Sequence, residues 1–178
     1  YQALILVPTI TLVEQWEDEC KRFNFSHIIK VSSKNQGWRS EIDDIKLKES
    51  LAESDESSLS FIIITTYASF SRESTFKQLM SLSKKIQRQM LLIADEAHNI
   101  GAPNIMSKLD RVKILRRIGL SATPERQFDD KGNKAVMQFF GCDAQYTFEY
   151  SMKEAIDNGF LCRYRYFPHV VRLNEDEM

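Results

Sequence analysis

Three short runs of aliphatic residues stand out along the chain, and none of them alternates with polar residues. They are Ala3 to Val7, Phe61 to Ile64 and Leu91 to Ala94. A run without alternation predicts a strand buried on both faces, which is typical of a parallel sheet covered by helices. His27 to Val31 is a further predicted strand, and Arg117 to Ser121 is predicted to end another.

Helical patterns lie between these predicted strands. The first helix is predicted to begin at Thr11, because Glu14 follows three residues later and completes a capping box. Two more helices are predicted over Ser40 to Ser54 and Ser151 to Asn158, and Glu53 to Ser60 is a predicted polar loop. One side of the first helix is apolar and is expected to face the core through Leu12, Val13, Trp16, Cys20 and Phe23.

The alternation of strands and helices predicts the fold class. Right-handed βαβ crossovers give an α/β sandwich, with a mostly parallel sheet and helices on both faces. In such sheets, ligands bind at the carboxyl ends of the strands. The chemistry of this chain is therefore expected where its strands end.

Composition narrows the classes of function. The net charge is -1 and the pI about 6.4, so any contact with nucleic acid must be local. Cys20, Cys142 and Cys162 form no CxxC pair, which argues against a disulfide framework or a zinc site and favours an intracellular, cytoplasmic setting. No apolar run approaches the about 20 residues that a membrane span needs, so no membrane partner is expected.

Two adjacent carboxylates follow the third aliphatic run. Asp95 and Glu96 come directly after Leu91 to Ala94, a layout that ATPases use where a strand ends beside the phosphates. In that layout the first carboxylate holds Mg²⁺, directly or through water, and the second orients and deprotonates the attacking water. We therefore expect ATP and Mg²⁺ as cofactors, with Asp95 as the metal ligand and Glu96 as the base.

Four segments together resemble one protein family, and they follow one another in the family's order. They are Leu6 to Thr9, Ile64 to Tyr67, Asp95 to His98 and Gly119 to Pro124. The sequence resembles the DEAH-box-like members of helicase superfamily 2, in particular the motor subunits of type III restriction enzymes and related DNA helicases. This resemblance implies a RecA-like P-loop NTPase sandwich and an ATP-dependent DNA helicase or translocase.

The resemblance also implies how the ATP site is coupled to nucleic acid. His98 would join Asp95 and Glu96 in the catalytic segment and bridge to the segment that contains Ser121 and Thr123. The hydroxyls of Ser121 and Thr123 would then couple the state of ATP to the grip on nucleic acid, because short polar side chains can exchange hydrogen bonds at a hinge.

The resemblance also implies that two of these four segments bind nucleic acid. Pro8 and Thr9 would offer backbone amides and a hydroxyl to the phosphates of one strand, and Thr65 and Thr66 would add further hydroxyls. Phosphate contacts position a strand without reading its bases. DNA and RNA therefore both stay open, and the resemblance favours DNA.

The phosphate cradle of such a motor is missing from the sequence. A P-loop needs a Gly-rich turn followed by Lys and Ser or Thr, and none of the six glycines is followed by such a pair. We expect the P-loop to precede residue 1 in a longer protein, and this chain alone to be inactive. The first motor domain is predicted over residues 1–160, and residues 161–178 as the lead-out toward a second RecA-like domain in cis.

The missing P-loop strand has a predicted structural consequence. In the family that strand lies inside the sheet, beside the strand that ends at Ser121. Its absence should leave an unpaired sheet edge, and such edges promote association with other chains. Self-association through this edge is therefore expected.

The residues leave two alternative functions open. The first keeps the motor fold but makes it a double-stranded DNA translocase of the restriction or chromatin-remodelling type. The second is a catalytically dead, helicase-like module that serves as a binding domain. A P-loop lysine in the longer protein would argue against the second.

Overall fold

A five-stranded parallel sheet forms the centre of the domain. The computed structural model describes residues 1–51, 59–142 and 146–169. The strand order is β2-β3-β1-β4-β5, and every neighbouring pair is parallel. The strands are β1 Gln2–Val7, β2 Ile28–Val31, β3 Phe61–Thr66, β4 Leu91–Asp95 and β5 Arg116–Leu120. The predicted fold class is therefore confirmed.

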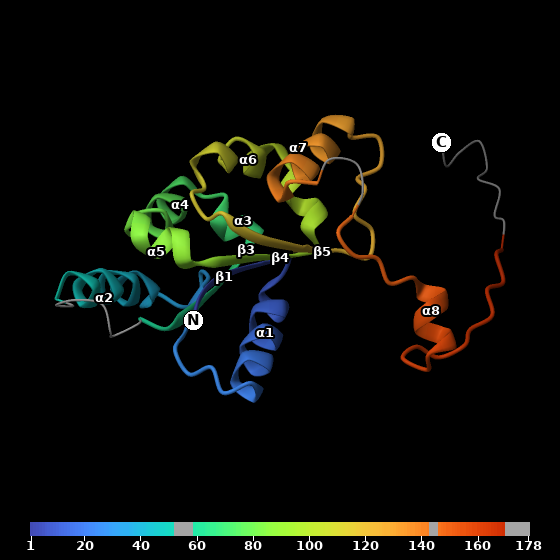
Figure 1. The fold of residues 1–178 in the computed structure, drawn as a ribbon, viewed down its shortest axis with the longest axis horizontal. Helices are drawn as coiled ribbons and strands as arrows, with labels where there is room; N and C mark the ends of the chain where they lie inside the picture. The colour runs from blue at the N-terminus through green and yellow to red at the C-terminus, as the bar shows by residue number, and fades with distance from the viewer. Residues whose placement is uncertain (52–58, 143–145, 170–178) are drawn as a thin grey trace, which may run out of the picture. The chain divides into compact units, whose positions relative to one another are not determined.

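Helices cover both faces of this sheet, as predicted, but unequally. Figure 1 shows α1 alone on one side of the sheet, whereas α3, α4, α6 and α7 lie on the other. The helices are α1 Ile10–Arg22, α2 Trp38–Leu51, α3 Tyr67–Phe70, α4 Glu73–Leu79, α5 Lys84–Gln89, α6 Pro103–Met106, α7 Asp130–Phe140 and α8 Met152–Asp157, with 3-10 turns η1 Ala97–Gly101 and η2 Leu109–Arg111.

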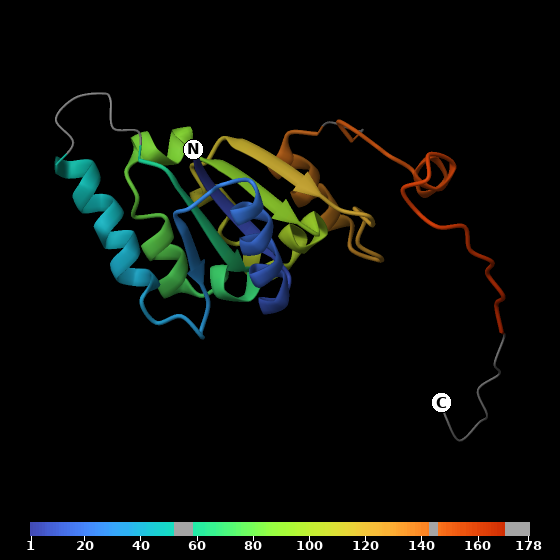
Figure 2. The same ribbon diagram turned by 90° about the horizontal axis from the view of Figure 1, so that it is seen from below.

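The two faces of β1 explain its unbroken aliphatic run. Leu4 and Leu6 pack into a large cluster with residues of α2 to α7, whereas Ile5 and Val7 pack into a smaller cluster with α1. All four side chains are buried. Figure 2 looks onto the face that α1 covers and shows that helix in front of the strands. A strand covered on both faces needs apolar residues at every position, which is why alternation is absent.

The start and end of α1 differ from the prediction. The helix begins at Ile10, and Thr9 rather than Thr11 is the N-cap, because its extended backbone (φ -130, ψ 160) lets Oγ1 accept from the Leu12 amide at 3.3 Å. The predicted capping box at Thr11 is therefore wrong. Phe23 lies beyond the last turn and is 74% exposed, so it is not a core residue.

The other predicted elements differ in their bounds. The helix predicted from Ser40 begins earlier, at Trp38, and is described as far as Leu51. Most of the loop predicted over residues 53–60 lies outside the described residues. No helices were predicted for α3 to α7, and most of these are too short to show a clear helical period.

The strand β5 lies at one edge of the sheet and pairs with β4. Ile118 is 45% exposed and Leu120 is 43% exposed. Their face is the one that α1 covers elsewhere, because the intervening Gly119 packs against Ala97 and Phe140 on the opposite side. An apolar edge strand is thus present where the unpaired edge was predicted.

Residues 145–178 form a separate compact unit, and residues 1–144 form the first. In the second unit, α8 has the predicted capping box: Ser151 Oγ accepts from the Glu154 amide, and the Glu154 side chain accepts from the Ser151 amide. The domain boundary predicted at residue 160 stays a prediction. Within the described residues, no helix combines the length and the apolarity that crossing a membrane requires.

A carboxylate on α4 ties this helix to η2. Glu73 accepts two hydrogen bonds from the Arg111 guanidinium, at 2.9 and 3.1 Å, and one from Lys108 Nζ at 3.2 Å. Arg111 and then Lys108 lower the pKa of Glu73 from its ordinary 4.5 to about 2. The carboxylate therefore stays charged well into the acid range.

Replacing Glu73 by Gln is expected to reduce the acid sensitivity of folding. Because the pKa is depressed in the folded state, the contribution of Glu73 to stability is complete above pH 4.5 and is lost as the pH falls toward 2. Urea unfolding midpoints measured across this range should therefore fall less steeply in Glu73→Gln than in the wild type. Glu14→Gln, at an exposed position of α1, is the control. Parallel curves for Glu73→Gln and the wild type would contradict the stabilising role of the Glu73 carboxylate.

Candidate functional site

The predicted site residues follow the carboxyl ends of parallel strands. Thr9 follows β1, Thr66 ends β3, Asp95 ends β4 and Ser121 follows β5. Because all strands point the same way, these positions lie together at one end of the sheet, where the strands have their carboxyl ends. This is the end at which open α/β sheets bind ligands.

Three groups hold Asp95 in place. The Trp16 indole Nε1 donates to Oδ2 at 2.9 Å, and the Glu96 amide donates to Oδ1 at 3.0 Å. The Tyr67 hydroxyl donates to the Asp95 carbonyl at 2.8 Å. Burial first, and then the charges of Asp95 and Glu96, raise the pKa of Tyr67, so this phenol stays protonated and remains a donor. The carboxylate is thus oriented from α1 and from its own backbone.

The backbone of Glu96 adopts the left-handed conformation, with φ 50 and ψ 58. A residue with a Cβ pays about 1 to 3 kcal/mol for such a conformation, and residues of this kind cluster at active sites. Here it ends β4 and begins η1, so that Glu96 turns toward the segment after β5.

Four side chains form a hydrogen-bonded chain in which each side chain donates to the next one. Asn99 Nδ2 lies 3.3 Å from His98 Nε2, and His98 Nδ1 lies 3.2 Å from Ser121 Oγ. Ser121 Oγ donates to Glu96 Oε2 at 3.3 Å. Because an amide nitrogen can only donate, His98 accepts at Nε2 and donates from Nδ1 in its neutral form; this tautomer is assigned from the network. The chain brings three of the predicted residues together.

Thr123, the second predicted coupling residue, occupies a different place. Its side chain is exposed, and its amide donates to Ser121 Oγ at 3.2 Å. In the described part of the chain, no hydrogen bond joins its hydroxyl to the segment Asp95 to His98. Of the two hydroxyls expected to couple the segments, the structure therefore brings only that of Ser121 to Glu96 and His98.

Arg126, which was not among the predicted site residues, fastens α7 over the segment Asp95 to His98. Arg126 Nη1 donates to the His98 carbonyl at 3.2 Å, and its Nε pairs with Asp129 at 2.7 Å. A Cβ on Gly101 would lie 2.8 Å from the Gly132 carbonyl, so α7 approaches η1 more closely than larger residues would allow. The two glycines were the available sequence signal, but glycine alone does not identify its partner.

The predicted nucleic-acid residues divide into exposed and buried sets. Pro8 is half-buried and Thr9 is exposed at the start of α1. Thr65 is fully buried and donates to the Val31 carbonyl at 3.0 Å, whereas Thr66 caps α3 through the Ser69 amide at 3.1 Å. Both of these hydroxyls are engaged inside the domain, and their contact with phosphate stays a prediction that the geometry does not support.

The end of β4 suits Mg²⁺ chemically. Mg²⁺ prefers hard oxygen ligands and usually takes one or two carboxylates while it keeps several waters. Asp95 is half-buried, and each of its carboxylate oxygens accepts one hydrogen bond, which leaves a lone pair on each for a further partner. Groups of three or more His, Cys, Asp or Glu arranged for a metal do not occur among the described residues. Asp95 thus fits a lightly ligated Mg²⁺.

The parallel sheet, the acidic pair at the end of β4 and the serine beside it agree with a RecA-like motor domain of helicase superfamily 2, the class to which the family match assigns the chain. The sequence matches the family described as type III restriction enzyme, res subunit, over residues 1–126. The chain therefore belongs to this family, whose members are helicase-like, ATP-dependent motors. No curated protein matches the chain.

The left-handed backbone of Glu96 leads to a stability test. Glu96→Gly is expected to be more stable than Glu96→Ala by about 1 kcal/mol, because both variants lack the carboxylate and only alanine keeps the strained Cβ. Chemical denaturation of the two variants measures this difference.

At the control position, the difference in stability between the Ala and Gly variants is expected to have the opposite sign. At Glu14, an exposed position within α1, the Ala variant should be the more stable one by about 1 kcal/mol, because glycine weakens a helix interior. An Ala variant at position 96 as stable as the Gly variant would contradict the strained conformation.

Proposed function

We propose that this chain is the part of an ATP-dependent DNA helicase or translocase in which Asp95 and Glu96 support ATP hydrolysis. The observation that carries this proposal is the hydrogen-bonded chain from Asn99 through His98 and Ser121 to Glu96. It links the proposed base to the segment after the neighbouring strand. In the full motor, this domain works in the cytoplasm with a second RecA-like domain.

Each carboxylate has its own task in the proposed reaction. Bound Mg²⁺ would neutralise charge on the phosphates. Asp95, held by Trp16 and the Glu96 amide, offers oxygens to that ion. Glu96 accepts a proton from the attacking water, and the left-handed backbone fixes the direction of its side chain.

The hydroxyl of Ser121 supplies the proposed coupling. It donates to Glu96 and accepts from His98, so a shift of the segment after β5 changes the environment of the base. Arg126 lies in the same segment and holds the His98 carbonyl from the α7 side. Movement there would alter both ends of the network, which is how a binding event can be transmitted to the catalytic carboxylate.

The proposed nucleic-acid contact lies at the start of α1. Thr9 Oγ1 accepts from the Leu12 amide, so the hydroxyl proton remains available to a phosphate oxygen. The N-terminus of the 13-residue helix α1 adds a favourable dipole for an anion. These contacts fit a sugar-phosphate backbone of any sequence.

Glu96→Gln and Ser121→Ala are expected to affect ATP hydrolysis differently in the motor that carries this chain with a P-loop and a second motor domain. Glu96→Gln should lower kcat by about 10²- to 10⁴-fold because it removes the general base, while ATP binding is retained. Ser121→Ala should lower the stimulation of hydrolysis by DNA more than the rate without DNA. Steady-state ATPase assays with and without DNA measure both effects.

Ser107→Ala, at an exposed position directly after α6 whose hydroxyl donates to the Asn104 carbonyl, is the control for the loss of a hydroxyl. Equal losses in both rates for Ser121→Ala would contradict the coupling role. Wild-type activity of Glu96→Gln would contradict the proposal as a whole. Unwinding and translocation assays on the same motor distinguish a strand separator from a double-stranded DNA translocase.

We also propose that the isolated chain self-associates through β5. The edge position of this strand and its exposed Ile118 and Leu120 support the proposal. Light scattering should show a mass that rises with concentration, and Ile118→Lys should reduce this rise by placing a charge on the edge. Leu47→Lys, at an exposed position of α2, is the matched control. A monomer at all concentrations would refute the association.

A further inference from the structure

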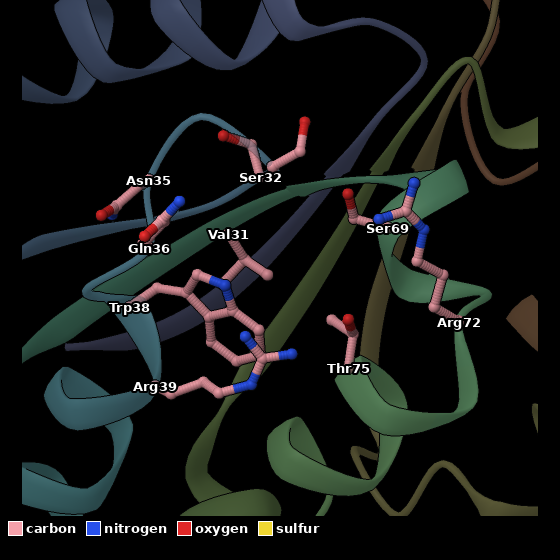
Figure 3. A pocket seen from close by; sticks show the side chains of 10 residues that line it. Val31, Ser32, Asn35, Gln36, Trp38, Arg39, Ser69, Arg72 and Thr75 are labelled. Carbon is pink, nitrogen blue, oxygen red and sulfur yellow. The ribbon is translucent and has the colours of Figure 1, made fainter.

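A polar cavity lies at the same end of the sheet as Thr9. It has a volume of about 420 Å³ and opens at the carboxyl ends of β2 and β3. Figure 3 shows Asn35, Trp38 and Arg39 on the α2 side of this cavity, and Ser69, Arg72 and Thr75 on the α3 and α4 side. We refer to it as the β2–α2 pocket.

Two arginines give the β2–α2 pocket its charge. Arg39 and Arg72 both line it and both are exposed. In the described part of the chain, no carboxylate forms an ion pair with either guanidinium, and the lining residues include no acid. An arginine fork without a carboxylate partner matches the geometry of a phosphate. The pocket therefore favours an anion.

Two buried residues contribute hydroxyls to the lining of the β2–α2 pocket. Thr75 is 4% exposed and Ser32 is 9% exposed, and both line the β2–α2 pocket. Among the described residues, neither hydroxyl makes a hydrogen bond, although Thr65 and Thr66 nearby are both engaged. Neither oxygen is among the described side-chain atoms that are fully buried without a partner, so both are reached from the pocket. A ligand with acceptor oxygens would accept a hydrogen bond from each hydroxyl.

The shape of the pocket disfavours a nucleobase. Trp38 is buried, and the Arg39 guanidinium lies 4.4 Å from its ring centroid, so this ring offers no free face for stacking. The rest of the lining is dominated by hydroxyls and amides, apart from Val31. The first residues of α2 also line the pocket, and the positive end of that helix dipole favours a phosphate.

We propose that the β2–α2 pocket binds a backbone phosphate of the nucleic-acid strand, through Arg39, Arg72 and the hydroxyls of Ser32 and Thr75. The proposal rests on the proposed function, since it extends the nucleic-acid surface from Thr9. The strand β3 is the direct neighbour of β1, so Thr9 and the pocket both lie at the carboxyl ends of adjacent strands. A nucleic-acid strand crossing that end of the sheet would contact both.

The first experiment measures the binding of this chain to a fluorescent single-stranded DNA of about 20 nucleotides by anisotropy. The Arg39→Gln/Arg72→Gln double variant should lose about ten-fold or more in affinity and reduce the salt slope by about 0.7, because the pocket is proposed to neutralise one phosphate of a single strand. The matched control, Lys85→Gln/Arg88→Gln, removes the same charge from α5, which leads into the amino end of β4, whereas the pocket lies at the carboxyl ends of the strands.

The control variant distinguishes a failure of the pocket proposal from a failure of the proposed nucleic-acid function. If both double variants lose affinity equally, DNA binding stands and the pocket is not its site, which overturns this inference alone. If the wild-type chain binds no DNA, the proposed nucleic-acid function fails and the pocket proposal fails with it. If millimolar inorganic phosphate raises the Tm of the wild type but not of the arginine variant while DNA affinity is equal in both, the ligand is a small phosphate and the proposal is wrong.

Thr75→Val provides a second, finer test. The substitution keeps the shape of the side chain and removes a hydroxyl that has no partner among the described residues. The Tm should therefore be unchanged or slightly higher, whereas DNA affinity should fall several-fold. Ser74→Ala, an exposed neighbour on α4, should change neither quantity. A lower Tm with wild-type affinity would mean that the Thr75 hydroxyl serves the fold and would overturn its assignment to the pocket.

Discussion

The parallel register of β4 with both of its neighbours is the constraint on which the site depends. Ala94 lies opposite Leu6 of β1 and opposite Gly119 of β5. The residues that follow these three positions therefore emerge together at one edge. A shift of β4 by one residue would exchange its two faces and turn its buried side chains outward. Burial of the aliphatic runs on both faces thus fixes the positions of Asp95 and Ser121 as well.

Much of the fold could be predicted because its three central strands, β1, β3 and β4, are covered on both faces and carry a strong local signal. The outer strands β2 and β5 were also predicted, although β5 is largely exposed. The short helices α3 to α6 could not be predicted, since their residues are buried by contact with the sheet rather than by a repeating pattern along the chain. The cap of α1 was misplaced by two residues because Thr9 and Thr11 have the same chemistry, and only the extended backbone of Thr9 distinguishes them.

The candidate site was predictable to the extent that its residues lie in recognisable segments. Glu96, His98 and Ser121 meet as the resemblance implied. The contributions of Asn99 and Arg126 depend on distances across the fold, and the burial of Thr65 depends on the approach of β2 to β3. The left-handed backbone of Glu96 leaves no trace in the sequence, because glutamate does not favour that conformation.

The positions of the two tryptophans give this domain two natural optical reporters. The chain contains only Trp16 and Trp38. The indole of Trp16 donates to the Asp95 carboxylate, and the ring of Trp38 lies under the Arg39 guanidinium. The fluorescence of Trp16 therefore reports on the acidic Asp95, and that of Trp38 reports on the basic Arg39. With either indole replaced by phenylalanine, the emission of the remaining one would follow events at a single one of these two places, so the order in which the two places respond becomes observable without any attached dye.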